Sequence, residues 1–107
     1  MQQLTKSALL NSMHLGEASI EIKQPLPTTP LKTQQWVDTF TQLFSLSASE
    51  SDWGADRFQV VLSSTKSPSF FQCVLCIEWL CEAIWLEPIG TQQSTTELMQ
   101  YFLEHRD

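Results

Sequence analysis

Three cysteines in the second half of the chain have the spacing of sites that bind zinc or exchange disulfides. Cys73 and Cys76 are separated by two residues, and Cys81 follows. A structural zinc site takes about four ligands, which usually come from two such pairs. If Cys73 and Cys76 lie on a strand, their odd separation directs them to opposite faces, so they cannot hold one ion together. We interpret them as packed core thiols, and predict no metal site and no cofactor.

The candidates for acid–base chemistry are two histidines and three glutamates. His14 and His105 lie near opposite ends of the chain, and no serine or cysteine stands in a glycine-framed turn typical of a nucleophile. Only three glycines occur, too scattered for a phosphate-binding loop. Glu78, Glu82 and Glu87 would need one buried carboxyl with a raised pKa to do acid–base work. We interpret them as solvated strand edges, so the sequence leans against an enzyme.

Trp53 is the most unusual single residue, because it stands in a polar segment and precedes Gly54. Exposed tryptophans are enriched at protein interfaces. Alternatively, the segment folds back and Trp53 covers the edge of the core. The sequence leaves both interpretations open.

The charge balance disfavours several classes of partner. The formal net charge is −6, from twelve acidic residues against six basic ones that are scattered along the chain. Such a chain repels phosphate backbones and anionic lipid surfaces, so we expect no nucleic-acid and no membrane partner. The odd number of cysteines argues against a secreted disulfide scaffold, and no apolar run suits a signal peptide or a membrane span. A cytoplasmic protein is therefore expected.

The first half of the chain predicts one strand and one helix. Residues 1–13 are polar with little periodicity, which predicts a flexible N-terminal arm or a short helix around Ser7–Ser12, followed by a single domain over 14–107. Alternation over His14–Lys23 predicts a half-buried strand. Thr29 before Pro30 is typical of a helix start, and the apolar stripe that follows predicts a helix over about Leu31–Ser45.

The second half predicts three strands and a second helix. After a polar loop at Ser47–Asp56, strands are expected at Arg57–Ser64, within the apolar run Phe70–Trp79, and at Ala83–Glu87. Ser94 with a glutamate three residues on predicts the start of a helix. The expected order is strand, helix, three strands, helix. This is an α+β fold with a single, mainly antiparallel sheet of about four strands and two amphipathic helices on one face.

One hairpin register can be predicted in detail. A tip at Leu80-Cys81 pairs Ile77 with Ile84 and Leu75 with Leu86 on one face. The opposite face then presents a mixed apolar and acidic set: Val74, Cys76, Glu78, Ala83, Trp85 and Glu87. Helices cover only one of these faces, so the other needs something else to cover it.

The strand-rich stretch from Phe58 to Leu103 resembles a small family of uncharacterised bacterial proteins. The residues that carry the resemblance are Glu82-Ala83-Ile84-Trp85-Leu86-Glu87, followed by a short C-terminal helix. The resemblance is to a domain of unknown function, so it implies no activity.

These observations favour a non-enzymatic module that binds a protein partner or forms a homodimer. The expected binding residues are those of the uncovered sheet face and the tryptophan of the polar segment: Trp85, Val74, Cys76, Glu78, Glu87 and Trp53. The alternative is a small-ligand-binding protein or minor enzyme, with a pocket between the sheet and the first helix near Trp53 and Trp36.

Overall fold

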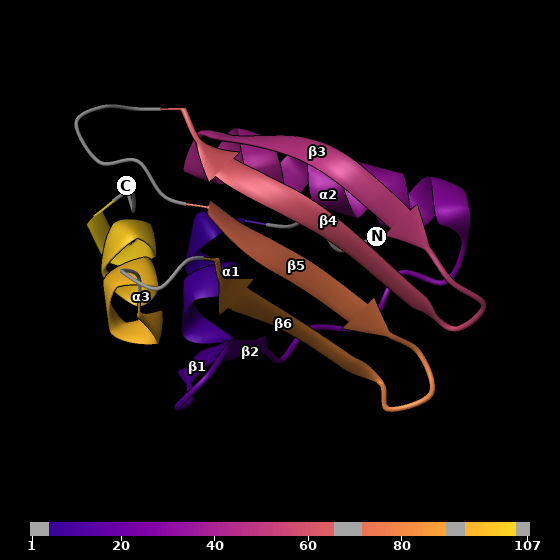
Figure 1. Cartoon of the computed structure of the whole chain (residues 1–107), viewed down its shortest axis with the longest axis horizontal. Helices are drawn as coiled ribbons and strands as arrows, with labels where there is room; N and C mark the ends of the chain where they lie inside the picture. The colour runs from indigo at the N-terminus through magenta and orange to yellow at the C-terminus, as the bar shows by residue number, and fades with distance from the viewer. Residues whose placement is uncertain (1–4, 66–71, 90–93, 105–107) are drawn as a thin grey trace.

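The computed structural model describes residues 5–65, 72–89 and 94–104. In chain order these form α1 (Lys6–Asn11), β1 (Met13–Leu15), β2 (Ile20–Ile22), α2 (Pro30–Phe44), β3 (Leu46–Trp53), β4 (Arg57–Ser64), β5 (Gln72–Glu78), β6 (Ala83–Pro88) and α3 (Thr95–Glu104). The strands form one antiparallel sheet of six strands in the order β1-β2-β6-β5-β4-β3 (Figure 1). The α+β class is as expected, but the predicted four strands, two helices and their order are wrong.

One missed strand comes from a turn hidden inside the predicted strand His14–Lys23. The chain reverses between Leu15 and Ile20, where the Gly16 N–H donates to the Ser19 carbonyl at 2.9 Å. A Cβ on Gly16 would lie 3.0 Å from that carbonyl oxygen, so the close turn favours glycine. The regular alternation of Ala18, Ile20 and Ile22 begins inside the turn, so it predicts β2 but does not separate it from β1.

The other missed strand is β3, which covers most of the predicted Ser47–Asp56 loop. It pairs with β4 from Leu46 opposite Ser64 to Trp53 opposite Phe58. Only Leu46 is buried, because β3 forms an edge of the sheet and its remaining residues face water. A polar edge strand lacks the apolar alternation that identifies half-buried strands. The register shifts by a bulge between Ser49 and Asp52, where Glu50 has a φ of 55°.

The N-terminal segment contributes to the core. Residues 6–11 form α1, whose first turn is capped by the Thr5 side chain accepting from the Ala8 N–H, and Leu9 is fully buried. The predicted short helix around Ser7–Ser12 therefore matches this segment, while residues 1–4 lie outside the described part of the chain.

The two longer helices begin at the predicted caps. The Thr29 hydroxyl accepts from the Lys32 N–H at 3.1 Å at the start of α2, and the Ser94 hydroxyl accepts from the Glu97 N–H at 3.2 Å at the start of α3. The last turn of α2 ends at Ser45, in the left-handed conformation that commonly stops a helix.

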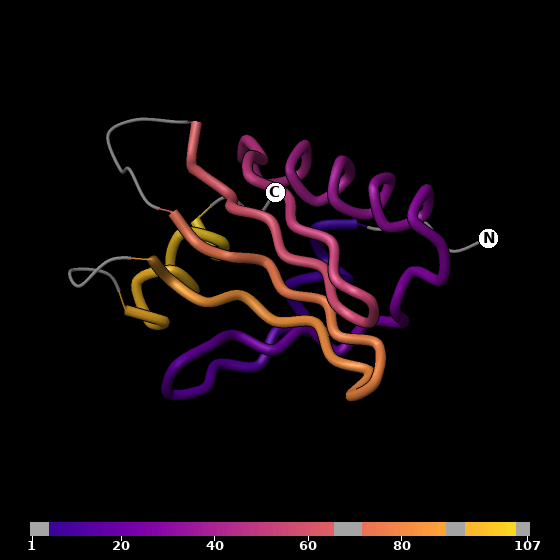
Figure 2. The backbone as a smooth tube through the Cα atoms, turned by 45° about the vertical axis from the view of Figure 1, so that its right-hand side comes forward, coloured from indigo at the N-terminus to yellow at the C-terminus, as the bar shows by residue number. Residues whose placement is uncertain are grey.

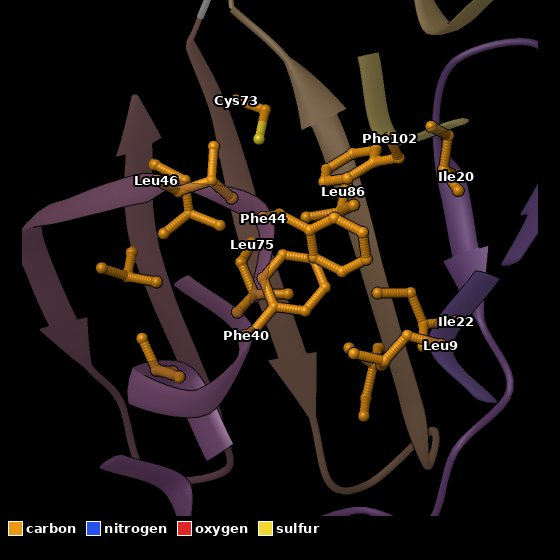
Figure 3. Close-up of a cluster of buried hydrophobic side chains, with 14 of the residues drawn as sticks. Leu9, Ile20, Ile22, Phe40, Phe44, Leu46, Cys73, Leu75, Leu86 and Phe102 are labelled. Carbon is orange, nitrogen blue, oxygen red and sulfur yellow. The ribbon is translucent and has the colours of Figure 1, made fainter. Parts of the chain in front are cut away.

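The helices contribute to one shared core on one side of the sheet. α2 runs along this side, behind β3 and β4 (Figures 1 and 2). The ring of Phe102 from α3 lies 5.0 Å from that of Phe44 and 5.8 Å from that of Phe40, and Leu9 of α1 joins the same cluster (Figure 3). We call this side of the sheet the covered face and the opposite side the outer face.

Candidate functional site

The outer face carries a row of side chains that crosses five neighbouring strands. Adjacent strands pair Glu21 with Trp85, Trp85 with Cys76, Cys76 with Gln59, and Gln59 with Asp52. Directly paired residues of an antiparallel sheet point to the same face and lie close enough to interact. The row therefore joins β2, β6, β5, β4 and β3 into one surface.

Two shorter rows flank this one. The first contains Glu87, Val74 and Val61, and the second contains Ala83, Glu78 and Arg57. Val61 and Val74 are half-buried, although the helices of the described chain lie on the other side of the sheet. The centre of the outer face is thus apolar and its surroundings are mostly acidic.

The predicted hairpin register is confirmed. Leu75 pairs with Leu86 and Ile77 with Ile84, and all four side chains are fully buried on the covered face. The residues that alternate with these four along β5 and β6 point to the outer face, as the alternation of strand side chains requires. The structure therefore brings together five of the predicted binding residues: Val74, Cys76, Glu78, Trp85 and Glu87.

Trp85 lies at the centre of this group and its orientation is fixed by a neighbour. Its indole Nε1 donates to the Glu87 Oε1 at 2.7 Å, two residues along the same strand. The indole is half-buried, so part of it stays open to solvent. A tryptophan held in one orientation loses little conformational entropy on binding, as is typical of interface anchors.

A shallow hollow of about 330 Å³ lies beside Trp85, between the β1–β2 hairpin and β6. Its polar lining includes His14, Ser19 and Glu21, and its apolar lining includes Leu15, Ala83 and the indole. Glu21 also contacts Lys23, whose Nζ lies 3.2 Å from Glu21 Oε2. Sequence reasoning missed Glu21 because the pairing of β2 with β6 joins segments far apart in the chain.

The cysteines are poorly suited to nucleophilic chemistry. Burial raises the pKa of Cys73 to about 12. Burial, with the nearby Glu87 carboxylate as a smaller cause, raises the pKa of Cys76 to about 11. The exposed Cys81 thiol donates to Glu78 Oε1 at 3.2 Å, and this hydrogen bond raises its pKa as well. Thiolate is the reactive form, so all three groups are largely unreactive at neutral pH.

Cys73 and Cys76 are both buried thiols, as interpreted from the sequence, and they lie on opposite faces of the sheet. Cys73 is fully buried on the covered face, but Cys76 lies on the outer face, where it is 1% exposed between Trp85 and Gln59. The Gln59 amide Nε2 lies 3.7 Å from the Cys76 sulfur. The two sulfurs therefore lie on opposite faces of β5, which prevents them from binding one ion together.

Trp53 is separate from the other predicted binding residues. It pairs with Phe58 at the edge of the covered face, and the two rings are 4.4 Å apart. The indole is 45% exposed, so it covers the edge of the core and also meets solvent. The structure therefore supports the interpretation that Trp53 covers the edge of the core, at a position away from the outer face, and its role in an interface stays a prediction.

The alternative pocket between the sheet and α2 is small. A hollow of about 130 Å³ opens between Val37 of α2 and β3, with Phe58 and Val60 at its base. Small-molecule sites usually have volumes of about 300–1,000 Å³. Trp36, which the sequence placed near such a pocket, is instead stacked on Phe40 with ring centroids 5.3 Å apart.

Two further features bear on chemistry and on membranes. Within residues 5–65, 72–89 and 94–104, no three histidine, cysteine, aspartate or glutamate side chains gather closely enough to hold a metal ion. None of the helices in these ranges combines the length and apolar character needed to cross a bilayer. His105, the second histidine considered in the sequence, lies outside the described residues.

Comparison of the chain with protein-family models, with curated proteins and with solved structures finds no match. The resemblance of residues 58–103 to a family of bacterial proteins therefore remains an expectation from sequence. The outer face itself, defined by its register and its exposure, is the feature from which a function can be argued.

Proposed function

We propose that this chain is a non-enzymatic protein-interaction module that binds a partner protein through its outer face. The observation that carries the proposal is the half-buried apolar centre of that face, formed by Val61, Val74 and Trp85. The three helices of the described chain pack on the opposite side. Contiguous apolar surface with a polar surround is typical of protein interfaces.

The charges around the apolar centre indicate the kind of partner. The carboxylates on the outer face are Glu21, Asp52, Glu78 and Glu87. The cations there are Arg57 and Lys23, and Lys23 already contacts Glu21. A second copy of the chain would bring the same excess of carboxylates to the interface, and like charges placed together cost free energy. A partner with a basic surface meets this face with complementary charge, and the formal net charge of −6 on the whole chain adds to that attraction.

The side chains at this site favour binding over catalysis. The Cys76 thiol is protonated at neutral pH because its pKa is about 11. The Glu87 carboxylate already accepts the indole hydrogen bond from Trp85, which gives it a positioning role. A binding surface needs no more than the fixed aromatic, the apolar centre and the charged rim that these strands supply.

Site-specific photo-crosslinking would test the proposal. The photoreactive residue p-benzoyl-phenylalanine is placed at Val74 in one variant, and at Leu31 in a control. Leu31 is 68% exposed on α2 and distant from the outer face. In cells that naturally contain the protein, we expect light to produce one discrete heterologous adduct from position 74, absent from position 31. The adduct should disappear when Trp85→Ala is added to the position-74 variant.

Two results would contradict this proposal. Equal adduct patterns from both positions would mean that the outer face has no special role. An adduct of twice the mass of the chain would show that a second copy occupies the face, and the basic partner would be rejected.

A further inference from the structure

We propose that the hollow beside Trp85 binds an arginine side chain of the partner, with the guanidinium between the indole and Glu21. This inference rests on the proposed function, because it names the anchor group that the outer face would receive. It concerns one part of that face, the corner where β2 and the β1–β2 turn meet β6.

The register places the two binding groups side by side. Glu21 and Trp85 are direct partners on neighbouring antiparallel strands, and both line the hollow. A guanidinium can stack on an indole face while its N–H groups reach a carboxylate in the same plane, which a lysine ammonium cannot do. This combination of a ring and a carboxylate therefore favours arginine among the cationic side chains.

The shape of the hollow suits the rest of an arginine side chain. Its volume of about 330 Å³ exceeds what a guanidinium fills, and Ala83 and the Trp85 indole supply apolar walls. Ala83 lies two residues from Trp85 on the same face of β6, so its methyl group and the indole can pack against the methylene groups of an incoming arginine. Long cationic side chains commonly bury their stems on apolar surface in this way.

Neighbouring charges strengthen the preference for a cation. The Glu87 carboxylate, 2.7 Å from the indole Nε1, places a second negative charge at the edge of the same ring. Lys23 contacts Glu21 at 3.2 Å, but the two side chains are 60% and 44% exposed. Such exposed ion pairs contribute little free energy, so an arginine that also gains the indole can displace Lys23.

A titration of the full chain with small probes tests the inference directly. The probes are N-acetyl-arginine amide and its neutral isostere N-acetyl-citrulline amide, followed by ¹H–¹⁵N NMR spectra of the ¹⁵N-labelled protein. We expect the arginine probe to shift the Trp85 indole N–H and the amides of Glu21 and Ala83, with a Kd on the order of 1 mM. The citrulline probe should bind at least about tenfold more weakly, because it keeps the shape and loses the charge.

Two matched variants control for general electrostatic attraction. Glu21→Gln should weaken binding of the arginine probe at least about fivefold, since it removes the carboxylate of the hollow. Glu97→Gln removes the same charge from an exposed position on α3 and should leave the Kd unchanged. Equal affinity for the two probes, or equal loss in the two variants, would overturn the inference.

The outcomes separate this inference from the proposed function. If crosslinks form from position 74 but the arginine probe does not shift the hollow, the outer face is an interface with a different anchor and the inference is rejected. If the arginine probe binds in the hollow but no heterologous crosslink forms, the guanidinium site is supported and the proposed protein partner is rejected.

Discussion

The two faces of the central strands carry similar residues, but the helices cover only one of them. On β4, Val60 is 2% exposed on the covered face, and its neighbour Val61 is half-buried on the outer face. On β5, Cys73 is buried beneath the helices, and Cys76 is buried on the outer face between Gln59 and Trp85. The comparison teaches that side-chain chemistry does not decide the role of a residue in this sheet. Whether a residue has an odd or an even position along its strand decides which face its side chain joins. That face decides whether its neighbours are the helices or the residues of the outer face.

The largest difference between the faces is expected on removing an aromatic ring. Phe40→Ala should lower the free energy of unfolding by about 3–5 kcal/mol, because Phe40 is fully buried against Phe44 and Phe102. Trp85→Ala should lower it by about 1 kcal/mol, because the indole is only half-buried on the outer face. Urea unfolding followed by far-UV circular dichroism measures both values.

If Phe40→Ala does not fold, Phe40→Leu gives a measurable loss at the same position. Equal losses at Phe40 and Trp85 would mean that the outer face is as much a part of the core as the covered face, and the comparison would fail.

Adjacent valines give the sharpest matched pair. Val60→Thr should cost about 1–3 kcal/mol, because it places a hydroxyl in the core at a site that is 2% exposed. Val61→Thr, one residue along, should change the free energy of unfolding by no more than about 0.5 kcal/mol. Both replacements suit a strand, so β propensity cancels in the comparison. Urea unfolding of the two variants measures both changes. A larger loss of free energy of unfolding in Val61→Thr than in Val60→Thr would contradict the assignment of the two faces.

The covered face should also make stability depend on alkaline pH through Cys73. Its pKa rises from 9.0 to about 12 on folding, so the folded state holds the thiol proton more tightly than the unfolded state does. This contribution is fully present below pH ~9 and is lost as the pH rises through the folded pKa. Between pH 8 and pH 10 the free energy of unfolding should fall by about 1.4 kcal/mol on this account.

Urea unfolding under reducing conditions at the two pH values measures this effect. Other groups also titrate in this range, so the fall in free energy of unfolding between pH 8 and pH 10 is compared in two proteins. It should be smaller by about 1.4 kcal/mol in Cys73→Ala than in the unmodified chain. An identical pH dependence in both proteins would show that Cys73 does not titrate abnormally.

The smallest effect on stability is expected from a charge on the outer face. Glu21→Gln breaks the contact with Lys23. Because both side chains are substantially exposed, the free energy of unfolding should change by less than about 0.5 kcal/mol. Thermal unfolding compared with Glu97→Gln measures this difference. A large loss would make Glu21 a structural residue and would complicate its use as a test of arginine binding.

Local signals in the sequence predict the elements that combine a helix cap or an apolar stripe with burial. The helix after Thr29 and the hairpin that pairs Ile77 with Ile84 are examples, because cap chemistry and alternation both act between residues close in sequence. The resulting outer-face group around Trp85 follows from the hairpin register alone.

The remaining strands and part of the site depend on interactions that sequence spacing does not encode. β3 is polar because it lies at the sheet edge, and only its pairing with β4 makes it a strand. Glu21 reaches Trp85 through the pairing of β2 with β6, which joins segments about sixty residues apart in the sequence. No local pattern specifies that partner, so the hollow beside Trp85 could not be predicted from the sequence.

The bulge in β3 has a consequence for how molecules of this protein meet one another. An eight-residue edge strand offers backbone N–H and C=O groups to a strand of another molecule, which is a common route to aggregation. In β3 that ladder is interrupted near its middle, where Glu50 adopts a φ of 55° and the register slips. Carboxylates at Glu50 and Asp52 add repulsion between approaching copies. The bulge and the carboxylates thereby protect this edge from pairing with the edge of another molecule.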